Sequence, residues 1–135
     1  MRVAFASTDG KTVNAHFGHA ECFYLWDIGP NTAAAVGRVK LTSDAEDGED
    51  RIVAKARALD GCTLVYITQI GGPAAAKLVG HHIQPVKALS DTPIDEAILK
   101  LQTVLQNRPP PWLRKALGAK GEAETADEES SSLIT

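Results

Sequence analysis

TLVYIT, at residues 63–68, constrains the fold of this 135-residue chain more than any other segment. It is rich in β-branched residues and almost continuously apolar, which is typical of a central strand buried on both faces. Before it, residues 52–59 place apolar side chains on one helical face. After it, Gly71-Gly72-Pro73 introduces a short helix over residues 74–79. A buried strand between two helices predicts an α/β fold in which helices cover both sides of the sheet.

Four more strands complete the expected sheet, three before the first helix and one after the second. Short apolar or alternating runs that end at turn-forming residues identify them. In chain order, the expected strands are residues 2–6, 23–28, 34–41, 63–68 and 83–88. With a third helix at the end, the order βββαβαβα predicts a mixed five-stranded sheet with helices on both faces. Its first three strands form an antiparallel meander, and the two helix-linked strands run parallel to the strands they join. If the strand at 63–68 lies beside the first and parallel to it, the loops after both strands emerge at the same edge of the sheet.

Charged and capping residues mark the ends of the first and last helices. In the segment 52–59, Lys55 and Arg57 stand near the rear, where basic side chains complement the helix dipole. For the last helix, Thr92 is the expected N-cap and Pro93 the first helical residue. An apolar face then continues to Leu105, which makes this the clearest helical pattern in the chain.

Composition divides the chain into three parts. Residues 1–106 form the α/β domain, and residues 107–121 form a Pro-rich, basic extension with at most a helical turn at 112–117. Residues 122–135 contain five acids, no basic residue and few apolar ones, so we expect this tail to be disordered. The whole chain has a net charge of −3, but residues 1–121 hold 14 basic and 12 acidic residues and therefore carry +2.

Neither a membrane protein nor a nucleic-acid-binding protein is indicated. No apolar run approaches the roughly 20 residues that cross a bilayer, and the mild overall acidity argues against a surface that neutralises phosphates. The N-terminus does not resemble a signal peptide. Two cysteines are too few for a disulfide framework in a chain of this length. We therefore expect a cytoplasmic protein with reduced thiols.

The common catalytic motifs are missing from the sequence. It contains no GxGxxG, P-loop, GxSxG or HExxH pattern. A nuclease of this strand order would hold two metal ions with carboxylates on the sheet, yet the first strand carries no acid. Cys22 with His16 or His19 could form a nucleophile and base, but no third group is present to orient them. The expectation is a protein that is not an enzyme.

The loop NAHFGHAEC at residues 14–22 holds the most informative chemistry, with two imidazoles and a thiol within seven positions. Imidazole and thiolate together suit iron, zinc or an iron–sulfur cluster. The alternative is that His16 and His19 are ordinary solvated or hydrogen-bonded side chains and that Cys22 is a small buried apolar residue. Spacing alone does not decide between them.

The position of this loop favours a binding site. It follows the first strand, and the turn containing Gly71 and Gly72 follows the neighbouring parallel strand, so both meet where ligands bind in open α/β sheets. The two glycines expose backbone N–H groups at a helix N-terminus, which attracts anions. The alternative is a simple tight turn. His81 and His82 precede the last strand and should lie at the opposite edge.

Five short blocks of the sequence, read together, resemble one known family. They are VAFASTDG at 3–10, HFG at 16–18, LDGC at 59–62, GGPA at 71–74 and QPVK at 84–87. Over residues 1 to about 106 the chain is similar to the dinitrogenase iron–molybdenum cofactor biosynthesis family. PPWLRKAL, at 110–117, most resembles the NifX branch of that family.

The resemblance implies a ribonuclease H-like fold without nuclease activity and a non-enzymatic role. Such a protein would be a carrier or storage protein for an iron–sulfur precursor of the iron–molybdenum cofactor, NifB-co-like and bound transiently. Its partners would be nitrogenase cofactor assembly proteins, such as NifB and a NifEN-type scaffold. The alternative from another class is a regulatory or chaperone-like protein that binds those assembly proteins without an obligatory cluster.

The resemblance also suggests which residues bind the precursor. The histidine of the family's His-Phe-Gly motif corresponds to His16, the expected iron ligand, with Cys22 as a candidate second ligand. Chemically, a carrier needs few exchangeable ligands, since many thiolates would hold an anionic cluster too tightly to release it. The other expected contacts are Asn14, His19, Gly71 and Gly72.

Overall fold

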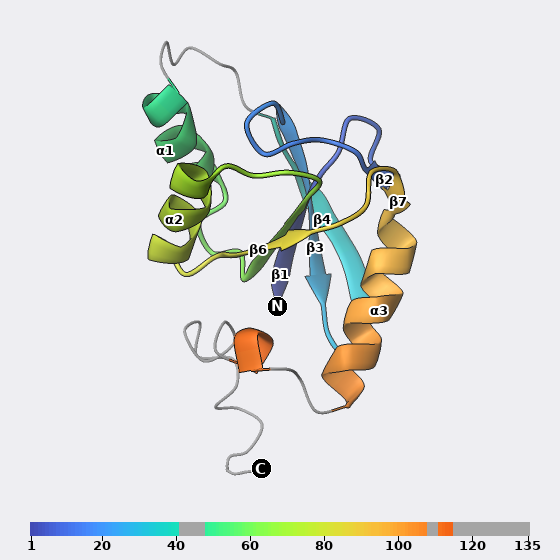
Figure 1. Cartoon of the computed structure of the whole chain (residues 1–135). Helices are drawn as coiled ribbons and strands as arrows, with labels where there is room; N and C mark the ends of the chain where they lie inside the picture. Colours follow the sequence, from blue (N-terminus) through green and yellow to red (C-terminus); the bar gives the residue numbers. More distant parts are fainter. Residues whose placement is uncertain (41–47, 108–110, 115–135) are drawn as a thin grey trace.

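The computed structural model describes residues 1–40, 48–107 and 111–114, and a mixed five-stranded sheet lies at its centre (Figure 1). Its strands are β1 (Arg2–Ala6), β3 (Cys22–Ile28), β4 (Ala33–Lys40), β5 (Leu64–Ile67) and β6 (Gln84–Lys87). They are arranged in the order β4-β3-β1-β5-β6. The helices are α1 (Gly48–Ala58), α2 (Gly72–Gly80) and α3 (Ile94–Gln106).

The pairing of the strands confirms the predicted topology. β1 pairs antiparallel with β3, and β3 pairs antiparallel with β4, which makes the meander. β5 lies parallel to β1 on its other side, and β6 lies parallel to β5. The carboxyl ends of β1 and β5 therefore meet at one edge of the sheet, as the sequence predicts.

Helices cover both faces of the sheet, as predicted. Successive side chains of each central strand point to opposite faces of the sheet, so every strand contributes to both faces. Ala4, Phe23 and Val65 belong to one buried cluster with residues of α1 and α2. Phe5, Leu64 and Tyr66 belong to a second buried cluster with residues of α3. In Figure 1, α1 and α2 accordingly lie on one side of the sheet and α3 on the other.

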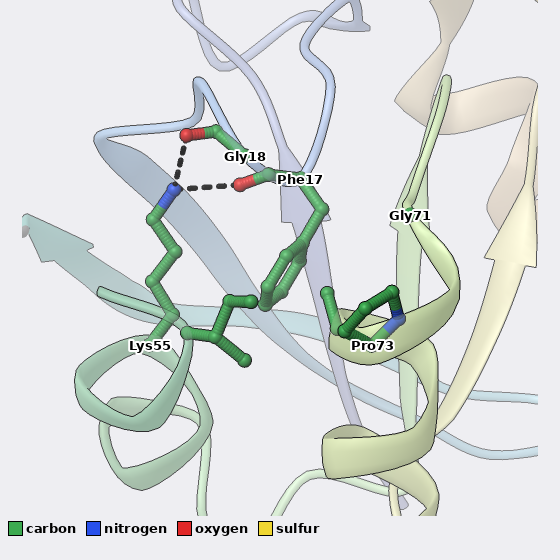
Figure 2. Close-up of a pocket in the computed structure, with 7 residues that line it drawn as sticks. Phe17, Gly18, Lys55, Gly71 and Pro73 are labelled. Atoms are coloured by element: carbon green, nitrogen blue, oxygen red, sulfur yellow. Dashed lines mark hydrogen bonds between the residues drawn. The ribbon is translucent and has the colours of Figure 1, made fainter. Parts of the chain in front are cut away.

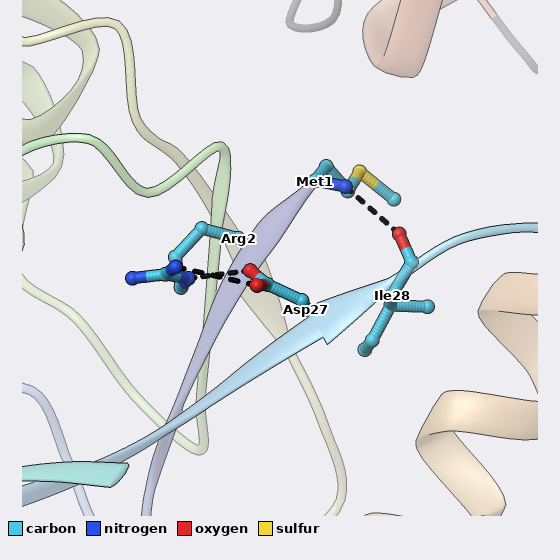
Figure 3. A network of polar contacts seen from close by, with 4 residues as sticks. All are labelled: Met1, Arg2, Asp27 and Ile28. Atoms are coloured by element: carbon cyan, nitrogen blue, oxygen red, sulfur yellow. Dashed lines mark hydrogen bonds and ion pairs between the residues drawn. The ribbon is translucent and has the colours of Figure 1, made fainter. Parts of the chain in front are cut away.

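The N-terminal end of β1 is tied to the end of β3 (Figure 3). The Met1 ammonium donates to the Ile28 carbonyl oxygen at 2.9 Å. Arg2 pairs directly across the strands with Asp27, with guanidinium–carboxylate distances of 2.6 and 3.3 Å. This bidentate contact lowers the pKa of Asp27 and raises that of Arg2. At this end of the sheet a cation thus has an acid directly opposite.

The predicted start of the last helix is wrong. Thr92 and Pro93 form β7 (Thr92–Pro93), which pairs antiparallel with β2 (Thr12–Val13) in a two-stranded sheet that the sequence analysis missed. Pro93 is the N-cap of α3, and Ile94 is its first residue. The Ile94 N–H donates to the Lys11 carbonyl oxygen at 2.8 Å, so the segment pairs with the loop after β1 before it turns into helix. Tertiary pairing overrides the local capping signal here.

The segment that follows α3 contributes to the core. Residues 111–114 form the expected short helical turn, and Leu113 is fully buried in the α3-side cluster. The rest of the predicted turn, at 115–117, and the predicted tail at 122–135 lie outside the described residues. No helix in the described ranges is long and apolar enough to cross a membrane.

Candidate functional site

The loop at residues 14–22 lies across the carboxyl end of β5. The Thr68 N–H donates to the Ala15 carbonyl oxygen at 3.1 Å, and the Phe17 N–H donates to that of Gln69 at 2.8 Å. These bonds hold the loop beside the segment that leads to Gly71 and α2. The structure therefore brings together the two segments that the sequence predicts to meet at the switch point of the sheet.

Within this loop a tight turn presents two imidazoles at the surface. The N–H groups of His19 and Ala20 donate to the His16 carbonyl oxygen at 3.1 and 2.9 Å. His16 and His19 are both exposed, and their rings stack with centroids 5.5 Å apart and planes inclined by 17°. Parallel rings direct their in-plane lone pairs along separate lines, so in this arrangement they would contact different atoms rather than chelate one ion.

Two buried side chains fix this turn. Phe17 is fully buried and contacts Phe23, with ring centroids 5.9 Å apart. Lys55 of α1 is only 7% exposed, and its Nζ donates to the carbonyl oxygens of Phe17 at 2.7 Å and Gly18 at 2.9 Å (Figure 2). The same ammonium lies 5.4 Å from the centre of the Phe17 ring. The sequence pattern indicated only that Lys55 complements the helix dipole, so this contact with the distant turn is a finding of the structure.

Lys55→Met should loosen the His16 turn and destabilise the fold by about 1–3 kcal/mol, because the Phe17 carbonyl loses its donor in a buried setting. Arg57→Met is the matched control, since Arg57 is an exposed cation on the same helix. Urea unfolding of both variants measures the effect. Equal stability of the two would contradict a structural role for the Lys55 ammonium.

A pocket of about 250 Å³ opens between this turn, α1 and the start of α2 (Figure 2). Its lining is mostly apolar and consists of Phe17, Gly18, Ile52, Lys55, Gly71, Pro73 and Ala74. Gly71 is the N-cap of α2, with no side-chain capping bond and no acid in the first helical turn. The positive end of the helix dipole is therefore not neutralised by the helix itself. Gly72 is the first residue of α2 and does not line the pocket.

A second pocket, of about 300 Å³, lies on the other side of the turn and contains His19 and Cys22. It also contains Arg38 and Lys40 of β4, which the sequence did not single out as site residues. The predicted site residues are therefore divided: Gly71 belongs to the first pocket, His19 and Cys22 to the second, and His16 stands at the surface on the turn between them.

Asn14 has a structural role in the loop. Its Oδ1 accepts from the Thr8 N–H at 2.9 Å, and its Nδ2 donates to the Thr8 hydroxyl oxygen at 2.9 Å. Both the oxygen and the nitrogen of the Asn14 amide thus bond to Thr8, in the segment after β1. These bonds hold the loop in place and do not direct the Asn14 side chain toward His16.

Asp9 organises the preceding turn. Its Oδ1 accepts from the N–H groups of Lys11 and Thr12 at 2.8 and 3.0 Å and from the Ser7 hydroxyl at 3.0 Å. These bonds favour the charged carboxylate, chiefly through the backbone N–H of Lys11, and lower the pKa of Asp9 to about 2. The turn that positions β2 therefore depends on ionised Asp9.

Asp9→Asn should flatten the acid dependence of stability between about pH 4 and pH 2. A depressed folded-state pKa stabilises the fold above the unfolded value of about 3.9, and this contribution is lost as the pH falls toward the folded value. The depressed pKa of Asp27 leaves a residual slope in the variant. Unfolding at several pH values measures the acid dependence of stability, and an NMR titration of the carboxyl measures the pKa of Asp9. An Asp9 that titrates near 3.9 would contradict the geometry.

The remaining sulfur and imidazole groups lie away from this edge. Cys62 is buried at 1% exposure, before β5. His81 caps the end of α2, and His82 follows it with a φ of 62°, just before β6, so both lie at the opposite edge, as predicted. Among the described residues, no group of three or more His, Cys, Asp or Glu side chains is arranged to hold a metal ion.

Comparison with known proteins agrees with these features. Residues 1–104 match the family model described as "Dinitrogenase iron-molybdenum cofactor". NifX of Herbaspirillum seropedicae is 40% identical over 119 residues, covering 87% of this chain and 82% of the relative. NifX of Sinorhizobium fredii is 37% identical over 131 residues, covering 92% and 82%. NifY of Azotobacter vinelandii is 36% identical over 120 residues, but this chain spans only 49% of its length.

Two solved structures share the fold. The crystal structure of PH0822 superposes with a TM-score of 0.62 at 21% identity, covering 76% of this chain and 91% of that one. The Thermotoga protein TM1290 superposes with a TM-score of 0.52 at 19% identity, covering 77% and 89%. At these identities the likeness extends to the fold alone.

Proposed function

The chain belongs to the dinitrogenase iron–molybdenum cofactor family, and we propose that it is a non-enzymatic carrier of an iron–sulfur precursor of that cofactor. Its relatives are named NifX and NifY, so a part in cofactor biosynthesis follows from the family. The finer role, binding a NifB-co-like precursor transiently and passing it on, is the proposal. The partners are cofactor assembly proteins, such as NifB and a NifEN-type scaffold, in the cytoplasm.

The observation that carries the proposal is the exposed, stacked pair of His16 and His19 on a turn that buried contacts of Lys55 and Phe17 hold. A carrier needs ligands that are positioned in advance but remain accessible to an acceptor protein. The Lys55 hydrogen bond and the buried Phe17 ring hold the turn in position, while the two exposed imidazoles stay accessible to a partner. Parallel rings that address different atoms suit a cargo with several irons better than a single ion.

The surroundings of the turn suit an anionic cargo. The uncapped N-terminus of α2 lies beside Gly18 in the first pocket, and Arg38 and Lys40 lie near His19 in the second. Cys22 lines the second pocket and is half-buried, which makes it a weaker candidate ligand than the two exposed imidazoles. His16 is the iron ligand in this proposal, and His19 contacts a neighbouring atom of the cluster.

We also infer that the sheet is a ribonuclease H-like arrangement that has no nuclease function. The meander followed by two parallel strands supports the assignment. β1, which has the sequence RVAFA, brings no carboxylate to the centre of the sheet. The acids nearest to it, Asp9 and Asp27, are engaged in the turn after β1 and with Arg2. Among the described residues, no carboxylates are therefore placed on the sheet to hold the two metal ions of a phosphoryl-transfer site.

The test is anaerobic mixing of the purified protein with the isolated iron–sulfur precursor, followed by gel filtration with iron analysis and visible absorbance. The carrier proposal predicts that iron and colour elute with the protein and pass to an acceptor assembly protein. No co-elution, together with a stable cluster-free complex with an assembly protein, would instead establish the regulatory or chaperone-like alternative.

A further inference from the structure

The second pocket, which is lined by residues of the loop at 14–22, β3 and β4, contains the two cations Arg38 and Lys40. Arg38 and Lys40 are two residues apart on β4, so they lie on the same face of the strand, with Cα atoms about 7 Å apart. Across the β3–β4 pairing, Arg38 is opposite Tyr24 and Lys40 is opposite Cys22. No described acid forms an ion pair with either cation, although Glu21 also lines the pocket.

The opposite end of β3 provides a contrast. There Arg2 is opposite Asp27, and the two side chains form the bidentate ion pair of Figure 3. At the pocket end, two like charges stand side by side and hydroxyl and thiol groups occupy the opposite positions. Like charges on neighbouring positions of a sheet repel each other. An anion bound between them would remove that repulsion, and within the described ranges no carboxylate forms an ion pair with either cation.

The lining of this pocket also defines the kind of anion. The lining includes the cations Arg38 and Lys40 and the acid Glu21, together with the small apolar residues Ala15 and Ala20 and the aromatic Tyr24. Its volume of about 300 Å³ lies at the lower end of the roughly 300–1,000 Å³ of small-molecule sites. A lone tetrahedral oxyanion would leave much of this space to water and would not use the apolar part.

We propose that this pocket binds a small organic anion with two or three carboxylates, held by Arg38 and Lys40. The guanidinium of Arg38 takes one carboxylate by paired N–H donors, which is the geometry that arginine prefers. Lys40 takes a second carboxylate, and the carbon skeleton lies against the Tyr24 ring and the two alanines of the lining, Ala15 and Ala20. Since His19 lines the same pocket, the bound anion would lie next to the imidazole pair. The site needs no cluster, so it can be tested without one, although the carrier proposal places the same two cations beside the cargo.

Citrate is the test probe, with the purified cluster-free protein and calorimetric titration at constant ionic strength set with KCl, because exposed charges are screened by salt. The double variant Arg38→Gln/Lys40→Gln should weaken citrate binding at least tenfold. Lys87→Gln, an exposed cation on β6 at the other edge of the sheet, should leave it unchanged. Glu21→Gln should strengthen it, because one negative charge leaves the pocket rim.

Cys22 reports on where the anion binds. It lines the pocket and is half-buried, whereas Cys62 is buried, so alkylation of the folded protein should occur at Cys22. Citrate should slow modification of Cys22 by iodoacetamide, a neutral reagent, in the parent protein and in Lys87→Gln, but not in the double variant. Peptide mass spectrometry assigns the modified residue.

Three results would overturn the proposal. They are no citrate binding beyond that of KCl at equal ionic strength, equal binding by the parent and the double variant, or equal affinity for sulfate and citrate. The last would show an unspecific attraction of anions instead of a site shaped for a polycarboxylate. Because every arm uses cluster-free protein, failure here leaves the carrier test unaffected, and failure of the carrier test leaves this one valid.

Discussion

His16→Asn should weaken binding of the iron–sulfur precursor by at least the roughly 10–100-fold that removing a hydrogen-bonding partner of a metal ligand costs. The substitution removes the His16 imidazole, whose one contact among the described residues is the stacked His19 ring. The main-chain bonds that form the turn, from His19 and Ala20 to the carbonyl oxygen of residue 16, do not involve the imidazole and should persist. The loss should therefore be of ligation and not of fold.

The matched control is His82→Asn. His82 is also an exposed imidazole, but it lies before β6 at the opposite edge of the sheet, and its positive φ of 62° is one that asparagine tolerates. Cluster-bound iron after anaerobic gel filtration, measured over a range of precursor concentrations, gives the affinity of each variant. Equal loss in both variants would point to a general effect of histidine content, and no loss in either would remove His16 from the site.

The sheet and its helices could be predicted because their signals are local. The short apolar or alternating runs of the first three strands, the apolar run at 63–68 and the helical face of α3 are each visible within ten or so residues. Parallel strands joined by helices then leave few possible topologies. The error at Thr92 and Pro93 arose from the same reliance on local signals, because a two-residue strand such as β7 is defined only by its partner β2.

The candidate site could be predicted in outline but not in its supports. The proximity of the His16 loop and the Gly71 turn follows from topology, and the structure shows it. Lys55 is 38 residues from Phe17 in sequence. The sequence pattern of α1 does not distinguish a lysine exposed to water from one that donates hydrogen bonds to a distant turn. Arg38 and Lys40 were missed for a similar reason, since alternation identifies a face without saying what lies beside it.

Leu113→Ala should destabilise the protein by about 2–5 kcal/mol, the range for truncating a fully buried leucine. Leu113 follows the Pro-rich break after α3, yet it has no exposed surface and belongs to the cluster with Ile98 and Leu101 of α3. For a domain of this size the melting temperature should fall on the order of 10 °C. Thermal unfolding followed by circular dichroism measures it.

Trp112→Ala is the matched control, because Trp112 precedes Leu113 directly but is 42% exposed. A similar loss in both variants would mean that the helical turn at 111–114 matters as a whole and that the buried leucine is not the anchor.

Truncations then locate the domain boundary. A chain ending at residue 121 keeps Leu113 and should keep its melting temperature, because the deleted stretch is acidic and poor in apolar residues. A chain ending at residue 107 should lose as much stability as Leu113→Ala, since the α3 side of the core then lacks the same side chain.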